Sequence, residues 1–270
     1  MRAALNIIKA EMIKTYKNTF PSKMAVFPAL LWPVMMLLIA YYSFHPFDME
    51  GVQLPYGIDS SRMLLIFLLT GAMAYNTFWS MVTSAWSTSR ERQSGVLEMI
   101  FLSPANRFAI VYGRSLGSLI MDMWMFFTFS IVVLIIVGHF SVSNILWLVL
   151  AYVILIVCAT IWGGLMNALF LLSRDADYLF SVFGSPMTFF SGVNVPVSTF
   201  PLWARIISHI FPLTYCLIII RHIFMNDFDS ISGLQVILLV MILVVLVLLT
   251  RLILYIGERN NRRTGNLILY

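Results

Sequence analysis

The most polar stretch of this sequence, residues 89–104, reads SRERQSGVLEMIFLSP and carries residue types suited to binding a partner protein. Glu91 and Glu98 can make charge-assisted hydrogen bonds or cap a turn, and Gly95 permits a tight backbone bend. No other domain of the chain would cover the apolar side chains that follow Gly95. A connecting turn needs only a few residues, so this pattern favours a docking segment. Simple pairing of the acids with neighbouring arginines on a solvated surface is the alternative.

Side chains for other chemistry are sparse. None of the four lysines follows a glycine, so the Gly-Lys pair of a phosphate-binding loop is missing. Cys158 and Cys216 lie in or beside apolar stretches, and no CxxC or HExxH pattern offers a thiol or metal site. The four histidines lie apart from most of the acids, which disfavours Ser-His-Asp hydrolysis. We therefore expect no catalytic, cofactor-binding or metal-ligating residue, and no enzyme.

The composition indicates the kind of structure in which these residues lie. Apolar residues make up 60% of the 270-residue chain, charged residues make up 11%, and the mean hydropathy is +0.91. Typical soluble domains are about 45–50% apolar and about 25% charged, so a water-soluble protein is excluded. Two cysteines and no long polar tract also exclude a disulfide-stapled module and a disordered chain. The basic residues behind the net charge of +5 lie at the ends of the apolar stretches and do not form one cluster, which argues against a nucleic-acid partner.

We predict an all-α membrane protein with six transmembrane helices. A bilayer core requires about 20 apolar residues in each helix. Residues 178–224 are apolar but broken by glycines and prolines, which predicts a span near 178–191 followed by a re-entrant element in the outer leaflet. The other five spans are predicted at residues 24–44, 63–86, 108–137, 145–172 and 234–256.

Lysine and arginine residues set the predicted orientation. With a cytoplasmic N-terminus, 14 of the 17 fall on the inner side and three on the outer side, so both termini are expected in the cytoplasm. Leu5, Ile8, Met12 and Tyr16 recur at helical spacing, which predicts a helix lying in the membrane surface. The chain is then one transmembrane domain (1–270) with an interfacial elbow helix (1–22), a cytoplasmic coupling segment (87–107), an external re-entrant region (192–232) and a cytoplasmic tail (257–270).

Two motifs resemble those of a known family. Residues 90–98, RERQSGVLE, and the Leu-Ser-Pro that follows at 102–104 are similar to the segment after the second span in membrane subunits of ABC type-2 exporters. Residues 190–196, FSGVNVP, with later FPLW and PLTY stretches and Arg221, resemble that family's signature between the last two spans. The predicted layout is similar over the whole chain. Val96 and Asn194 depart from the common pattern and leave the substrate subgroup open.

The resemblance implies a permease subunit in the cell membrane that exports a drug, a lipid or an amphiphilic peptide. It implies half of a dimeric translocation path, completed by a second permease copy or a paralogue and surrounded by membrane lipid. A separate ABC ATPase subunit would bind ATP and Mg on the cytoplasmic side, whereas this chain would bind no cofactor. The absence of a Gly-Lys pair agrees with that division.

The resemblance also implies three groups of functional residues. The ATPase-coupling group is Arg90, Glu91, Gly95, Leu97, Glu98, Pro104, Arg174 and Asp175. The translocation-path group, mostly on spans two and five, is Tyr75, Asn76, Phe78, Trp79, Asp122, Phe183, Met187, Phe190 and Ser191. The external-gate group is Gly192, Val193, Pro196 and Pro212.

Asp122 is an acid placed inside a predicted span, where an ionisable group is costly and faces the protein interior or water. Two roles are open from the sequence. The carboxylate could line an inward-facing cavity, or it could accept a structural hydrogen bond from Asn76 or Asn167 on a neighbouring helix.

Two other functions stay open. A polysaccharide or teichoic-acid exporter has a wide path lined by aromatic residues, and the aromatic content of 14% permits this. A non-transporting membrane scaffold or sensor subunit belongs to another class, and it would purify without an ATPase and form no dimer.

Overall fold

The protein is described from a computed structural model. It covers residues 2–19, 61–84, 105–137, 142–172, 176–224 and 232–264, together with single positions between 27 and 42 and the residues Glu91 and Met99. Every regular element within these ranges is a helix, which confirms the all-α class. Most of the first predicted span, residues 24–44, lies outside the described residues.

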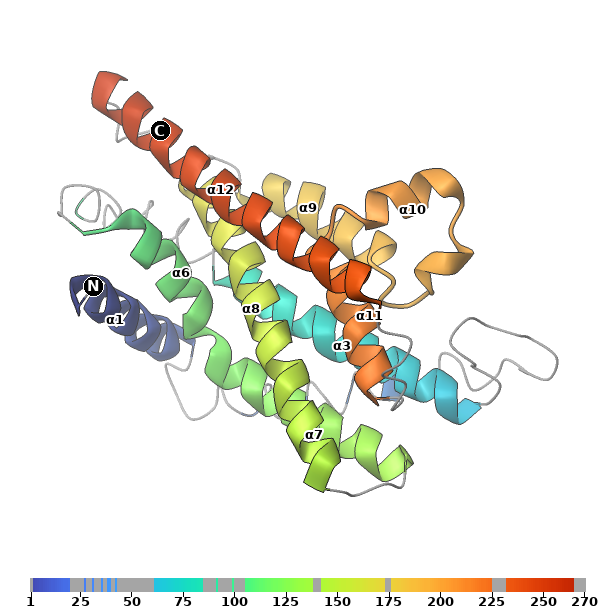
Figure 1. Cartoon of the computed structure of the whole chain (residues 1–270). Coiled ribbons are helices and arrows are strands. Elements are labelled where there is room, and N and C mark those ends of the chain that lie inside the picture. Colours follow the sequence, from blue (N-terminus) through green and yellow to red (C-terminus); the bar gives the residue numbers. More distant parts are fainter. Residues whose placement is uncertain are drawn as a thin grey trace.

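Ten helical elements follow one another along the described chain (Figure 1). They are α1 (Arg2–Thr19), α3 (Ser61–Thr83), α6 (Arg107–Gly117), α7 (Leu119–Val137), α8 (Val142–Leu172), α9 (Ala176–Phe190), the 3-10 turn η2 (Val197–Thr199), α10 (Leu202–Ser208), α11 (Pro212–Phe224) and α12 (Gly233–Thr264).

Helix α8 is the centre of the packing. It contacts α3, α6, α11 and α12, and Figure 1 shows it passing between them. Its buried side chains Leu155, Trp162 and Met166 share one apolar cluster with Met73 of α3 and Leu217 of α11. Inside a membrane such contacts stabilise the fold by close van der Waals packing, because lipid tails are as apolar as the side chains.

Helix α12 lies at the edge of this bundle. Only 17% of its apolar window is buried, although the helix has the highest hydropathy of the candidate spans. Large aliphatic side chains project from it along its length, among them Ile237, Val244 and Leu252. A helix that is apolar on all sides and largely uncovered by protein has the character of a lipid-facing span.

Three described helices are long and apolar enough to cross a membrane, and five candidate spans result if each of two bent helix pairs is one span. Residues 108–137, predicted as one span, are bent by 41° between α6 and α7. At the bend the Ser118 hydroxyl donates to the carbonyl of Ser115, a side-chain contact that competes with the helical ladder next to Gly117. The second bend, of 90°, separates α10 from α11. The count of six spans stays a prediction.

Helix α1 lies within the segment predicted as an elbow. The face that packs on the protein differs from the apolar face predicted from the sequence. Leu5 and Tyr16, predicted on the apolar membrane face, are exposed. The contact with α6 is made by Ile8, Glu11 and Thr15, which lie close to the α6 glycines. The apolar pattern is therefore divided: Leu5 and Tyr16 are turned away from the protein, whereas Ile8 lies in the packed face, which is partly polar.

Candidate coupling and translocation sites

Four charged side chains form a closed ring where α1, α6 and Glu91 meet. The Arg114 Nη2 donates to Glu91 Oε2 at 2.5 Å, and the Arg114 Nε donates to Glu11 Oε2 at 3.3 Å. Lys14 Nζ lies 3.5 Å from Glu11 Oε2 and also pairs with Glu91 Oε1. These four residues, the ion quartet, balance two negative charges against two positive ones.

The ion quartet is largely withdrawn from solvent. Arg114 is only 1% exposed, and the side chains of Glu11 and Glu91 are about one tenth exposed. Removing one partner of such a group is strongly destabilising because the remaining charge is left buried and uncompensated. Glu91, the one coupling residue that the structure describes, is therefore fixed to α1 and α6 by ion pairs.

The other predicted coupling residues lie outside the described residues. They are Arg90, Gly95, Leu97, Glu98, Pro104, Arg174 and Asp175.

Glycines bring α1 and α6 close together beside the ion quartet. A Cβ on Gly113 would lie 3.0 Å from the Ile8 Cα, and one on Gly117 would lie 2.4 Å from the Thr15 Cβ. Glycines four residues apart allow two helix backbones to approach in this way. Any larger side chain at Gly117 would push the two helices apart and disturb the nearby ion pairs.

The same stretch, Gly113 to Gly117, spells the G-x-S-x-G pattern of hydrolase nucleophiles. In those enzymes the serine stands on an exposed turn between a strand and a helix. Here Ser115 lies inside α6, is fully buried, and donates to the Val111 carbonyl. The motif serves helix packing and gives no nucleophile.

Asn167 of α8 joins three helices by polar contacts. Its Nδ2 lies 3.2 Å from the Ser84 Oγ, 3.1 Å from the Ser115 Oγ and 2.9 Å from the Gly163 carbonyl. Gly163 lets α8 approach α3 here, because a Cβ at that position would lie 2.8 Å from the Met81 Cβ. This set of contacts was not predicted, although an amide and several serines within apolar spans were a usable signal.

The predicted path residues divide by burial. Asn76, Phe78, Met187 and Ser191 are enclosed within the protomer. Tyr75 and Trp79 of α3 and Phe183 and Phe190 of α9 are half-buried, so these four aromatic side chains offer surface outside the protomer core. The rings of Tyr75 and Trp79 lie 5.8 Å apart, and Phe190 meets Trp203 of α10 edge to face at 5.9 Å.

The predicted gate residues form a turn that is held against α3. Gly192 has a φ of +82°, a conformation that favours glycine. Arg221 of α11 donates to the carbonyls of Val193 at 3.1 Å and Phe67 at 3.3 Å, and its guanidinium lies 3.5 Å from the centre of the Phe67 ring. Gly71 makes room for this turn, because a Cβ there would lie 2.2 Å from the Val193 carbonyl oxygen.

The two remaining gate residues lie after the turn at Gly192 and at the start of α11. Pro196 is buried at the end of the turn, and Pro212 is the first residue of α11, where a missing N–H costs no helical bond. The sequence placed Arg221 only in the family signature, and its part in fixing the turn was not predicted.

Asp122 is 1% exposed and sits near the start of α7. Neither carboxylate oxygen has a hydrogen-bond partner in the described part of the chain. The predicted bond from Asn167 is not formed, because its amide is directed to Ser84, Ser115 and Gly163, and the Asn76 amide donates to the Ala72 carbonyl. The hydroxyl groups of Ser80, Ser118 and Tyr152 lie within electrostatic range of the carboxyl group.

We expect the variant Asp122→Asn to keep the thermal stability of the unchanged protein to within about 1 kcal/mol. We also expect it to leave the export implied by the sequence motifs at an unchanged rate. The reason is that the buried carboxyl has no ion pair with the described residues to lose, and the amide keeps its shape. Thermal unfolding in detergent and transport in proteoliposomes measure the two effects. A folded variant with at least tenfold slower export would show that the acid itself takes part in transport.

Comparison with known proteins gives a family and two relatives. The family described as "ABC-2 family transporter protein" matches residues 2–252. The chain is 25% identical over 154 residues to the "Probable multidrug ABC transporter permease YbhR" of Escherichia coli (strain K12), and equally to the protein of that name in Escherichia coli O157:H7. The alignment covers 56% of this chain and 41% of each relative.

Proposed function

Because the chain belongs to the ABC-2 family of transporter proteins, we propose that it is the permease subunit of an ATP-driven exporter and is coupled to a separate cytoplasmic ATPase subunit. It spans the membrane several times with both termini in the cytoplasm, and the ATPase subunit binds ATP and Mg. Two permease subunits, identical or paralogous, together form the path. Residues 192–232 form the external re-entrant region of each one.

The ion quartet is the observation that carries this proposal. Glu91 stands near the start of the proposed coupling segment and is joined by ion pairs to Arg114 of α6 and Lys14 of α1. A displacement of the segment by the ATPase would therefore move α1 and α6 with it. Since α6 also packs on α8, the displacement reaches the centre of the bundle.

The proposed cargo is amphiphilic. Tyr75, Trp79, Phe183 and Phe190 are the path candidates with surface outside the protomer core, and aromatic faces suit a cargo of variable shape. The two curated relatives carry the word multidrug in their names, which supports the same class of cargo. The turn at Gly192 and Val193, fixed by Arg221, forms the outer gate of this path.

We expect the variant Gly95→Trp to insert into the membrane normally but to lose ATPase coupling. A tryptophan would prevent the tight bend of the coupling segment and displace the contact with the ATPase subunit. Loss of a central interface contact worth about 1.4 kcal/mol or more lowers affinity by about tenfold or more. The measurement is cargo-stimulated ATP hydrolysis and ATP-dependent export of a fluorescent amphiphilic dye by the permease and ATPase together in proteoliposomes.

Gly233→Trp provides the matched control, because no atom from elsewhere in the described chain lies within 4 Å of a Cβ at Gly233. This variant should keep full stimulation and export. Stimulation that persists in Gly95→Trp would contradict the proposed coupling segment. A complete lack of ATP-dependent export by the unchanged proteins with a broad set of amphiphiles would contradict the exporter function itself.

A further inference from the structure

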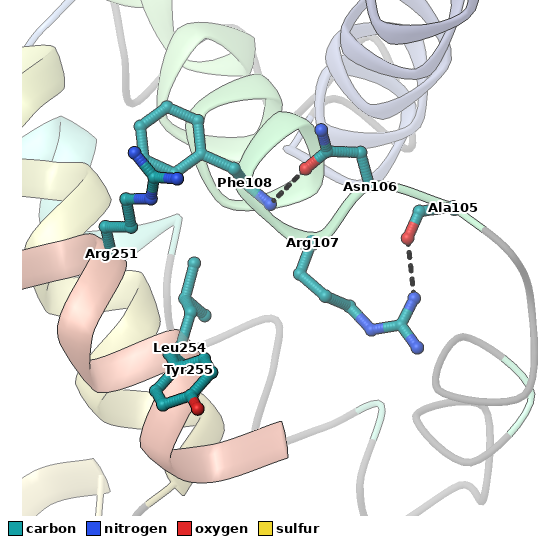
Figure 2. A pocket seen from close by; sticks show the side chains of 7 residues that line it. All are labelled: Ala105, Asn106, Arg107, Phe108, Arg251, Leu254 and Tyr255. Carbon is teal, nitrogen blue, oxygen red and sulfur yellow. Dashed lines mark hydrogen bonds between the residues drawn. The ribbon is translucent and has the colours of Figure 1, made fainter. Parts of the chain in front are cut away.

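A cavity of about 530 Å³ opens between the start of α6 and the last part of α12. Figure 2 shows Arg107 and Phe108 on one wall and Arg251, Leu254 and Tyr255 on the other. The volume is within the range of about 300–1,000 Å³ that holds small ligands. Ala105 and Asn106 complete the lining.

The polar groups of this cavity favour an anion. Two of its seven lining residues are arginines, contributed by helices far apart in sequence, and none of the seven is acidic. Arg107 donates through Nη1 to the Ala105 carbonyl at 2.6 Å, and Figure 2 shows its guanidinium turned toward Ala105, on the side opposite Arg251. Asn106 caps α6 by accepting from the Phe108 N–H, so the positive end of the helix also faces this region.

The apolar groups favour a lipid over a soluble anion. Phe108, Leu254 and Tyr255 line the same cavity, and Tyr255 is 62% exposed. Next to Arg251 on α12, Leu248 and Leu252 are also exposed, so the arginine emerges from a surface that suits acyl chains. Tyrosine is enriched at the level of lipid headgroups, where one end of the ring is apolar and the other is wet.

The depth of Arg251 within the apolar window of α12 favours a lipid over a cytosolic protein as the ligand of this cavity. The apolar window of α12 extends to Gly257, and Arg251 precedes that end by six residues. At a rise of 1.5 Å per residue this is about 9 Å inside the window. A side chain at that depth reaches toward the headgroup layer along its apolar stem, and a phosphate is the anion found there.

We propose that this cavity binds the phosphodiester of an anionic lipid of the cytoplasmic leaflet. The guanidinium groups of Arg107 and Arg251 contact the phosphate oxygens from both sides, as planar guanidinium groups do in charge-assisted pairs. Phe108, Leu254 and Tyr255 pack on the glycerol and the first part of the acyl chains. The bound lipid bridges α6, which carries Arg114 of the ion quartet, and the peripheral helix α12.

The test measures lipid binding by the purified full-length chain in detergent with native mass spectrometry and thermal unfolding. Dioleoyl phosphatidylglycerol should bind and raise the melting temperature, whereas dioleoyl phosphatidylcholine should not. The variants Arg251→Gln and Arg107→Gln should each bind phosphatidylglycerol about tenfold more weakly, the effect of losing one charge-assisted contact. Arg251→Lys should fall between the unchanged protein and Arg251→Gln, because lysine keeps the charge without the planar fork.

Arg259→Gln is the matched control, because Arg259 is an exposed arginine of the same helix outside the cavity. It should bind phosphatidylglycerol like the unchanged protein. An equal loss in Arg259→Gln, or equal binding of both lipids, would overturn the proposal in favour of general attraction to the membrane. An equal thermal shift with inorganic phosphate would assign the cavity to a soluble anion. Loss of the phosphatidylglycerol effect when the ATPase subunit is bound would assign it to that subunit instead.

Discussion

Replacement of Arg114 by leucine should destabilise the protein strongly, by about 3–5 kcal/mol. The variant removes the ion pairs that a side chain only 1% exposed makes with Glu11 and Glu91, and it leaves these two acids with Lys14 as their one described cation. The contact between α1 and α6 should loosen at the same time. A fall in the melting temperature in detergent and faster proteolysis of α1 are the expected measurements.

A combined variant separates charge balance from a general packing defect. Arg114→Leu together with Glu11→Gln and Glu91→Gln removes all the buried charge, and Lys14 can remain solvated because a third of its side chain is exposed. Replacing a whole buried ionic group is often close to neutral, so stability should largely return. A triple variant as unstable as Arg114→Leu alone would indicate that the ion quartet is not what holds α1 to α6.

The second large effect is expected from Gly71→Ala. The added Cβ would lie 2.2 Å from the carbonyl oxygen of Val193, which belongs to the backbone and cannot rotate away. The turn at Gly192 must therefore move from α3, and the bond from Arg221 to Val193 is lost with it. Overpacking of this kind costs about 1–3 kcal/mol, before the lost hydrogen bond is added. The melting temperature should fall, and a cysteine at the buried Val193 should become accessible to a maleimide.

Gly233→Ala is the control for this change. An added Cβ here would meet no atom within 4 Å from elsewhere in the described chain, and the position begins α12. Alanine should therefore leave stability unchanged or improve it by a few tenths of a kcal/mol. If Gly71→Ala melts like Gly233→Ala and Val193 stays protected, the turn is not held by close contact with α3.

Hydropathy predicted the long helices because the bilayer imposes a length and a composition on them. The predicted spans at 63–86, 145–172 and 234–256 correspond to α3, α8 and α12. The bend at Ser118 could not be predicted in this way, because residues on both sides of it are apolar and a glycine or a serine is tolerated inside a span. At the bend the Ser118 hydroxyl donates to the Ser115 carbonyl, a local contact that hydropathy does not reveal.

The candidate site was predicted less completely, because its contacts join distant parts of the chain. Arg114 and Glu11 are 103 positions apart, and Arg221 and Phe67 are 154 positions apart. Counting arginines placed Arg114 on the inner side of the membrane, but no local pattern indicates which acid it would meet. The motif around Gly192 was visible in the sequence, whereas the partner that immobilises it comes from another helix.

The peripheral position of α12 has a consequence for how its sequence can change over time. Because most of its apolar window is not buried within the described chain, few of its side chains must fit a particular neighbour closely. Leucine, isoleucine and valine can exchange there with little effect, provided that the helix remains apolar enough to stay in the bilayer. The constraint on α12 is one of composition, while the constraint on α6, with its packed glycines and Arg114, is one of position.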